Sequence, residues 1–187
     1  MEVVRTPSDL GVRDACREAL RLTLGEYVVL LNNDCIVTNS WLNLLVGLVS
    51  FSGANGLAGP MSNMAPIAQL VEGVPYRAAT AFGRPPLKLN GSLIDVAAVE
   101  RFAEDYNKEH KGNWIYTERL GGFCLIVKRE VLDKIGPAFE EHSDLGLFDT
   151  DILSAKARQV GYSLAVCRDL FVHHFGTRTF AHGPRKT

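Results

Sequence analysis

Three clusters of oxygen- and nitrogen-bearing side chains stand where the chain changes from apolar to polar. Asn32-Asn33-Asp34 follows the apolar run Tyr27–Leu31, and Asp149 and Asp151 lie two residues apart ahead of a helical pattern. His173-His174 ends a second apolar run near the C-terminus. Carboxylates and imidazoles can hold divalent cations and exchange protons, so these clusters indicate where chemistry could occur.

The cluster Asn32-Asn33-Asp34 has two interpretations. Asn and Asp side chains close turns after strands, and on the tripeptide alone a turn is the more frequent explanation. Ligands of open α/β sheets bind beyond the carboxyl ends of strands, and Asp34 stands at one. A carboxylate beside amide oxygens suits a hard cation, Mg²⁺ or Mn²⁺, whose other ligands would be water and phosphate.

The acidic pair also has two interpretations. Asp149 or Asp151 can cap the helix that follows and meet the positive end of its dipole, for which one carboxylate is enough. Alternatively, a carboxylate held in a cleft can act as a general base and take the proton of an incoming hydroxyl.

The role predicted for the histidine pair depends on the residues expected near it. Either His173 or His174 could reach a cation held by Asp34, and Arg178 could pair with a phosphate. A metal carboxylate, a candidate base, an imidazole ligand and a phosphate-pairing arginine together suit displacement at a centre whose leaving group is a diphosphate.

Apolar and helix-like stretches alternate along the chain, which predicts an α/β fold. Continuous apolar runs are typical of strands covered on both faces, so we expect a mostly parallel mixed sheet flanked by helices. The Gly-, Pro- and Asn-rich segment 53–91 is expected to be mainly loop. The expected strands are 2–4, 27–31, 35–37, 57–59, 123–127, 163–166 and 170–172, and the expected helices lie within 6–24, 40–53, 92–110, 129–135 and 150–160.

The overall composition is that of one ordinary globular domain. The 187 residues carry a formal net charge of −1, which argues against a nucleic-acid partner. The four cysteines are widely separated, so free buried thiols are expected rather than disulfides or a zinc site. Free thiols, and the lack of a signal-peptide pattern in residues 1–10, predict a cytoplasmic location.

Four segments resemble, in order, the family two glycosyltransferases of the A-type, Rossmann-like fold: GEYVVLLNNDCIVTNSWL, GGFCLIVKREVLDKIGPAFEE, FDTDILSAKARQVGY and VHHFGTRTF. The resemblance covers about residues 3–180. It implies transfer of a sugar from a nucleotide-diphosphate donor to an acceptor hydroxyl, usually with inversion and with Mg²⁺ or Mn²⁺. Polysaccharide biosynthesis and protein glycosylation are the processes it suggests, with a carbohydrate, lipid-linked or protein acceptor.

The resemblance also implies roles for single residues. Asn32, Asn33 and Asp34 match the donor-binding metal motif, with Asp34 as its carboxylate. The strand-entry loop Gly121-Gly122-Phe123 matches the acceptor side, and His173 or His174 matches the imidazole that completes the metal shell. Arg178 lies in the segment 177–187, expected as a flexible tail that can fold over the donor. Asp149 matches the catalytic base most closely, although the spacing to the following basic residues leaves Asp151 as an alternative.

The chain departs from the family at its N-terminus, where the strands that hold the nucleotide base are expected. We therefore expect residues 1–187 to be a single domain, the C-terminal two-thirds of an A-type glycosyltransferase domain truncated at its N-terminal side. Such a sheet would expose an edge, which predicts self-association. The alternative functions are a non-catalytic carbohydrate-binding or scaffold domain and, third, another metal-dependent phosphate-ester enzyme.

Overall fold

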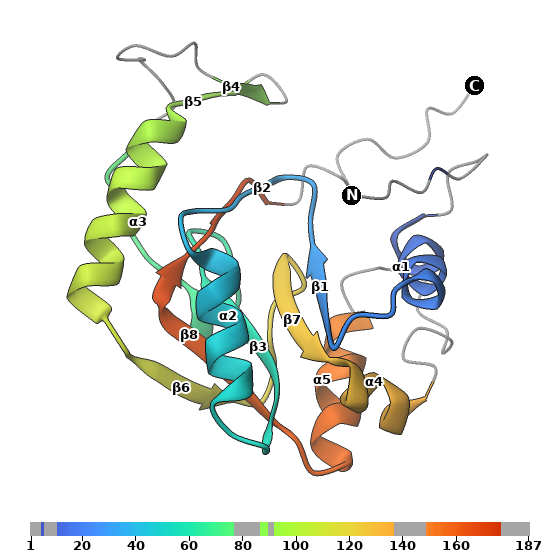
Figure 1. Cartoon of the computed structure of the whole chain (residues 1–187). Coiled ribbons are helices and arrows are strands. Elements are labelled where there is room, and N and C mark those ends of the chain that lie inside the picture. The colour runs from blue at the N-terminus through green and yellow to red at the C-terminus, as the bar shows by residue number, and fades with distance from the viewer. Residues whose placement is uncertain (1–4, 6–10, 77–86, 90–91, 137–148, 177–187) are drawn as a thin grey trace.

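A five-stranded mixed sheet forms the centre of the molecule (Figure 1). The computed structural model describes residues 5, 11–76, 87–89, 92–136 and 149–176. Along the sheet the strands follow the order β1 (Tyr27–Leu31), β7 (Cys124–Lys128), β3 (Asn55–Met61), β8 (Ser163–Phe171) and β6 (Trp114–Thr117).

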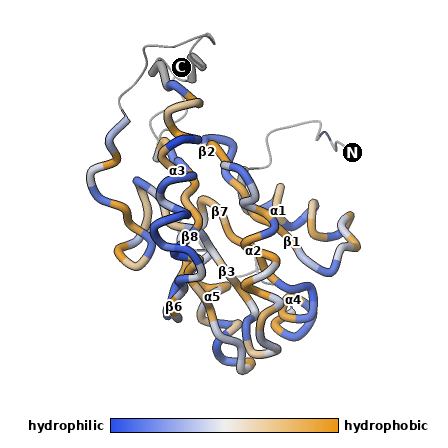
Figure 2. Tube along the Cα trace, turned by 60° about the vertical axis from the view of Figure 1, so that its left-hand side comes forward, coloured by the Kyte–Doolittle hydropathy of each residue, from blue (hydrophilic) through white to orange (hydrophobic). Residues whose placement is uncertain are grey.

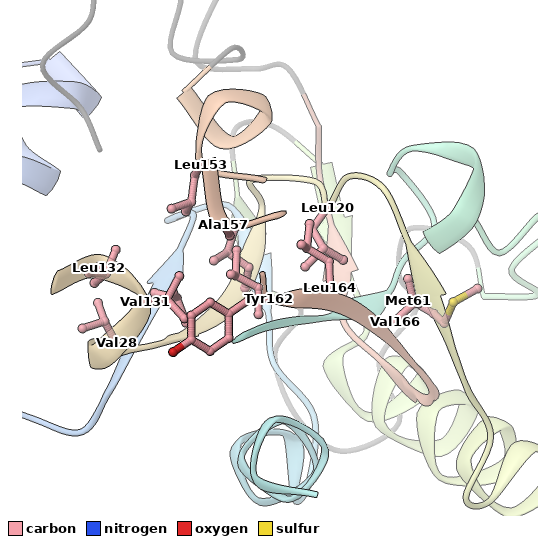
Figure 3. Close-up of a cluster of buried hydrophobic side chains, with 13 residues drawn as sticks. Val28, Met61, Leu120, Val131, Leu132, Leu153, Ala157, Tyr162, Leu164 and Val166 are labelled. Atoms are coloured by element: carbon pink, nitrogen blue, oxygen red, sulfur yellow. The ribbon is translucent and has the colours of Figure 1, made fainter. Parts of the chain in front are cut away.

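Helices cover both faces of the sheet. On one face, side chains of α2 (Trp41–Ser50) pack with alternate residues of β7 and β8. On the opposite face, side chains of α4 (Arg129–Ile135) and α5 (Asp149–Gln159) pack with the remaining residues of these strands, and Figure 3 shows this second cluster. Two residues of α1 (Gly11–Leu22) join this second cluster. In Figure 2 the hydrophobic colours concentrate along the central strands, as expected for a sheet covered on both sides.

The predicted α/β fold with a mixed sheet and flanking helices is confirmed, but the strand directions differ from the prediction. Within the described sheet, β3 and β8 form the one parallel pair, and the other three pairings are antiparallel. The sheet is therefore mostly antiparallel rather than mostly parallel. A continuous apolar run indicates that a strand is buried on both faces. It does not indicate strand direction, because helices cover both faces of this mostly antiparallel sheet as well.

Outside the main sheet, the described chain forms two small sheets and one long helix. β2 (Cys35–Ile36) pairs antiparallel with β9 (His173–His174), and β4 (Leu87–Leu89) pairs with β5 (Ser92–Ile94). A short 3₁₀ turn, Ile67–Gln69, follows β3. Helix α3 (Val96–His110) packs against β8 and begins at Asp95, whose side chain accepts hydrogen bonds from the backbone of Ala97 and Ala98. Every helix in the described part of the chain is too short or too polar to cross a lipid bilayer.

Most predicted elements are present with shifted bounds. The two short strands expected at 163–166 and 170–172 form a single strand, β8, and β6 was not predicted. Helix α2 begins after Ser40 as expected, but the Ser40 side chain makes no capping hydrogen bond. The strand expected at 2–4 and the tail 177–187 lie outside the described residues.

Strand β3 is longer than predicted although it contains Pro60. A register irregularity between Pro60 and Met61 accommodates the missing backbone donor. Gly59 lets the buried Gln69 side chain come close to the strand, since a Cβ on Gly59 would lie 2.8 Å from Gln69 Nε2. Residue types that sequence reasoning assigns to loops therefore form a buried strand here.

Candidate functional site

The pairing of β2 with β9 brings two distant parts of the chain together at the carboxyl end of β1. Cys35 lies directly opposite His174, and Asp34 lies in the turn before β2. The backbone carbonyl of Asp34 accepts a hydrogen bond of 3.0 Å from Phe175 N. The predicted turn exists, and it buries Asp34 to 6% exposure beside His174.

The contact between Asp34 and His174 has the geometry of a cation seat. His174 Nε2 lies 3.4 Å from Asp34 Oδ1, while Nδ1 lies 2.9 Å from the backbone carbonyl of Met64. A carbonyl only accepts, so Nδ1 carries a proton and Nε2 of the neutral ring presents its lone pair to the carboxylate. Asp34 Oδ1 is buried and has no hydrogen-bond partner within the described part of the chain. A cation, or a second proton on the imidazole, is needed between the two atoms.

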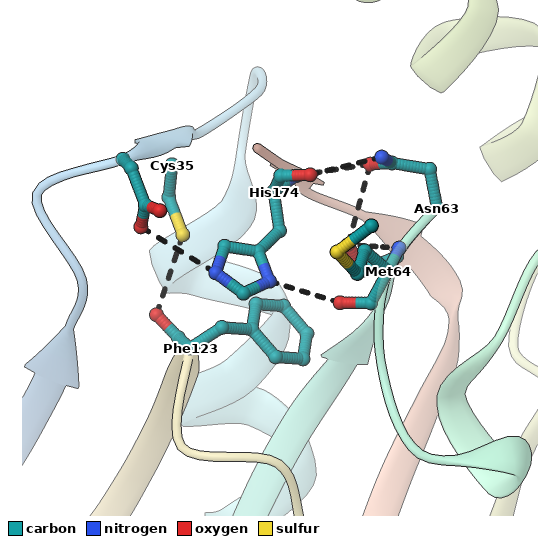
Figure 4. A network of polar contacts seen from close by, with 7 residues as sticks. Cys35, Asn63, Met64, Phe123 and His174 are labelled. Carbon is teal, nitrogen blue, oxygen red and sulfur yellow. Dashed lines mark hydrogen bonds and ion pairs between the residues drawn. The ribbon is translucent and has the colours of Figure 1, made fainter. Parts of the chain in front are cut away.

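The position of His174 is fixed from several sides (Figure 4). Its backbone N–H and C=O exchange two hydrogen bonds of 2.9 Å with the Asn63 side chain. Its ring stacks on Phe123, with centroids 5.2 Å apart and planes at 18°. Gly176, with φ of +74°, packs so closely on the Met64 side chain that a Cβ there would overlap the sulfur.

Cys35 brings a third ligand atom to the same place. Sγ of Cys35, a carboxylate oxygen of Asp34 and a ring nitrogen of His174 all lie within 4.8 Å of one another. Burial, assisted by the neighbouring Cys124 and Asp34, raises the pKa of the Cys35 thiol to about 12. Sγ donates to the carbonyl of Phe123 at 3.4 Å. These residues fit a divalent cation: a buried carboxylate, an imidazole in the ligand tautomer and a sulfur.

His173 lies on the other side of the strand, because successive residues of a strand point to opposite faces. Its Nδ1 lies 2.6 Å from the hydroxyl of Tyr76, and its ring makes edge contacts with Tyr76 and Phe175. The structure thus places His174, and not His173, next to Asp34.

The loop Gly121-Gly122-Phe123 lies between the cation seat and the start of α5 and contacts both. The carbonyl of Phe123 accepts a hydrogen bond of 2.8 Å from Asn32 N, and the N–H of Gly121 donates to Gln69 Oε1 at 2.7 Å. A Cβ on Gly122 would lie 2.8 Å from Cγ2 of Thr150. The loop therefore contacts the turn at Asn32, the His174 ring and Thr150 in the first turn of α5.

Both candidate aspartates stand at the start of α5. Asp149 is the first residue of the helix. Asp151, in the first turn, forms an ion pair of 3.3 Å between Oδ1 and Nε of Arg119. The side chains of Asn32 and Asn33 are exposed at the turn, and Arg178 lies outside the described residues.

No known protein-family profile matches the chain, and no curated protein matches it in sequence. Among solved structures, 28 chains match. One is the crystal structure of GalNAc-T7 with UDP, GalNAc and Mn²⁺, which aligns with 92% of this chain at a TM-score of 0.56 and 16% identity. The chain shares the fold of that glycosyltransferase. It spans 32% of the length of the GalNAc-T7 chain. The likeness confirms the predicted A-type glycosyltransferase fold, while membership of family two stays a prediction.

Several residues of the site escaped sequence reasoning. Asn63, Met64 and Gln69 hold His174 and Gly121, and Arg119 holds Asp151. The first three belong to the Gly- and Pro-rich segment 53–91, whose length alone was a signal of function. Cys35 was read only as a buried thiol, since nothing in the sequence places it opposite a histidine.

Proposed function

We propose that this chain is part of a glycosyltransferase that moves a sugar from a nucleotide-diphosphate donor to an acceptor hydroxyl. The observation that carries the proposal is the buried Asp34 Oδ1, which accepts no hydrogen bond in the described part of the chain and lies 3.4 Å from His174 Nε2, on a fold shared with a glycosyltransferase. The structure of that relative contains a nucleoside diphosphate, a sugar and Mn²⁺, the set of partners that such a reaction needs.

In this proposal Asp34 and His174 hold Mg²⁺ or Mn²⁺, and the exposed Asn32 and Asn33 border the donor. Bound there, the cation supplies positive charge for the diphosphate that leaves. Arg178 pairs with a phosphate oxygen of the donor. Met64 and Asn63 keep the imidazole in the orientation and tautomer that a cation ligand requires.

Asp149 acts as the general base in this proposal, and the reaction is a single in-line displacement with inversion. Its carboxylate takes the proton of the acceptor hydroxyl as that oxygen attacks the sugar carbon. Asp151 is the weaker candidate because the Arg119 guanidinium already engages its carboxylate. The loop Gly121-Gly122-Phe123, which contacts both the His174 ring and the first turn of α5, borders the acceptor.

The wider context is also proposed. The donor half that binds the nucleotide base would belong to a longer, cytoplasmic protein of the family two type. Its acceptor would be a carbohydrate, a lipid-linked sugar or a protein. In the described sheet β1 and β6 are the edge strands, and self-association through such an edge stays a prediction.

Calorimetric titration tests the proposal. UDP-, GDP- and dTDP-sugars are titrated, with and without Mn²⁺, into this chain and into a longer protein that contains it. We expect Mn²⁺-dependent binding of one nucleotide class and sugar transfer by the longer protein, both abolished by Asp34→Asn. Failure of the longer protein to bind any of these donors would refute the proposal and favour a non-catalytic carbohydrate-binding or scaffold domain.

A further inference from the structure

We propose that Cys35 is a third protein ligand of the cation seat, which makes the seat selective for thiophilic divalent metals such as Zn²⁺, Co²⁺ and Cd²⁺ over Mg²⁺. The inference rests on the proposed function, because it concerns the same seat that Asp34 and His174 form. It changes the expected ion: a carboxylate and an imidazole alone suit Mg²⁺ or Mn²⁺, whereas an added sulfur favours softer metals.

The backbone places the three ligand atoms for a shared ion. Cys35 and His174 are directly paired residues of β2 and β9, so their side chains lie on the same face of this two-stranded ribbon. Asp34 is the residue before Cys35 and closes the seat from the turn. The ligand atoms lie within 4.8 Å of one another. Since Zn–S and Zn–N bonds measure about 2.3 and 2.0 Å, small side-chain rotations bring all three onto one ion.

Each ligand is free to turn to a metal without leaving a buried group unpaired. His174 keeps its Nδ1 bond to the Met64 carbonyl, the outer contact typical of metal-binding histidines. Asp34 Oδ1 has no hydrogen bond to lose. When the Cys35 thiol leaves the Phe123 carbonyl, that carbonyl still accepts the hydrogen bond of 2.8 Å from Asn32 N.

The binding step balances in charge and atoms. The S–H bond of Cys35 breaks, a metal–sulfur bond forms, and the proton passes to solvent. The divalent ion then meets one carboxylate, one thiolate and a neutral imidazole, so the protein ligands neutralise its charge. Tetrahedral sites with three protein ligands keep their fourth position for water or substrate.

The experiment is a titration of the metal-free, reduced chain with Co²⁺, followed by absorption spectroscopy. A thiolate bound to Co²⁺ gives a strong charge-transfer band in the near ultraviolet that oxygen and nitrogen ligands do not give. We expect this band in the wild-type chain and in the control Cys16→Ser, and its loss in Cys35→Ser. Calorimetry should show that Cys35→Ser weakens Cd²⁺ binding at least about 10-fold, the loss that follows even from removing an outer contact of a ligand. Mg²⁺ binding should be unchanged.

A second measurement needs no variant. Cd²⁺ should protect Cys35 of the wild-type chain from alkylation, as seen by peptide mass spectrometry, while Mg²⁺ should not, and Cys16 serves as the internal reference. Binding of Co²⁺ without the sulfur band, or equal protection of Cys35 by both ions, would overturn the proposal and leave the seat of Asp34 and His174 intact. Absence of any cation binding would overturn this inference and the cation part of the proposed function together.

Discussion

When its ring is neutral, His174 directs an unprotonated Nε2 at a buried oxygen of Asp34, 3.4 Å away. Two hydrogen-bond acceptors at this separation oppose each other when nothing lies between them. A folded chain keeps such a pair only at a cost in stability, which is common where side chains are arranged for a ligand rather than for the fold.

Asp34→Asn should therefore stabilise the cation-free chain. The amide can donate to His174 Nε2 and carries no buried charge, so we expect a gain on the order of 1 kcal/mol in the free energy of unfolding. Thermal unfolding with EDTA and with Mn²⁺ measures both effects: Mn²⁺ should raise the melting temperature of the wild-type chain and not that of the variant. Asp133→Asn on the exposed side of α4 is the control, with a change below about 0.5 kcal/mol. A variant less stable than wild type in EDTA would contradict the prediction.

The sequence predicted the secondary structure well where one physical signal dominates. The apolar run at Tyr27–Leu31 and the helical spacing of 129–135 appear as β1 and α4 with the expected bounds. It predicted strand direction poorly, since burial on both faces looks alike in parallel and antiparallel strands. Strand β6 was missed although Trp114, Ile115 and Tyr116 favour a strand, because the run is short and two of its four residues are exposed.

The carboxylate and the imidazole of the site could be predicted from the sequence, but the residues that hold them in place could not. Asp34 and the histidine pair were found because each follows an apolar run, but strand periodicity became usable only once the register Cys35 opposite His174 was known. The Asn63 side chain binds the backbone of His174, and Met64 binds the His174 ring through its own backbone carbonyl. Residue type does not reveal such backbone contacts. The nucleotide-binding part, the domain bounds and the role of Arg178 stay predictions.

Gly122→Ala should disturb the link between the acceptor-side loop and α5. The new Cβ would lie 2.8 Å from Cγ2 and 3.1 Å from Oγ1 of Thr150, so we expect a loss of about 1–3 kcal/mol in urea unfolding. Thr150→Ala removes both atoms and leaves the Thr150 Cβ at 3.5 Å, an ordinary contact. The double variant should recover most of the loss. If the two losses simply add, then the loop and the helix do not touch as described.

Gln69 joins two parts of the chain that the site needs. Its Nε2 donates to the carbonyl of Pro60 at 2.8 Å, and its Oε1 accepts from Gly121 N at 2.7 Å, both buried. Gln69→Leu keeps the volume and leaves two buried backbone groups unpaired, at about 1–3 kcal/mol each. Urea unfolding measures this, and Gln159→Leu at the exposed end of α5 is the control. Equal stability of the two variants would mean that Gln69 has no such role.

Substitutions of Asp149 and Asp151 should have different effects on sugar transfer in a longer, active protein. Asp149→Asn should reduce sugar transfer by at least about 100-fold, the usual worth of a general base, and leave donor binding by calorimetry unchanged. Asp151→Asn should lose only the ion pair with the Arg119 side chain, which is itself largely exposed, and retain most transfer. The reverse pattern would assign the base to Asp151.

Alkaline pH should destabilise the chain through its buried thiols. Burial raises the pKa of Cys124 from 9.0 to about 12, so between these values the unfolded chain has lost a proton that the folded chain retains. Stability is then full below about pH 9 and falls as pH rises towards 12, by about 1.4 kcal/mol per pH unit for each such thiol. Urea unfolding of reduced protein across this window should show a shallower fall for Cys124→Ala than for wild type. Identical slopes for wild type and Cys124→Ala would show that the Cys124 thiol ionises equally in both states.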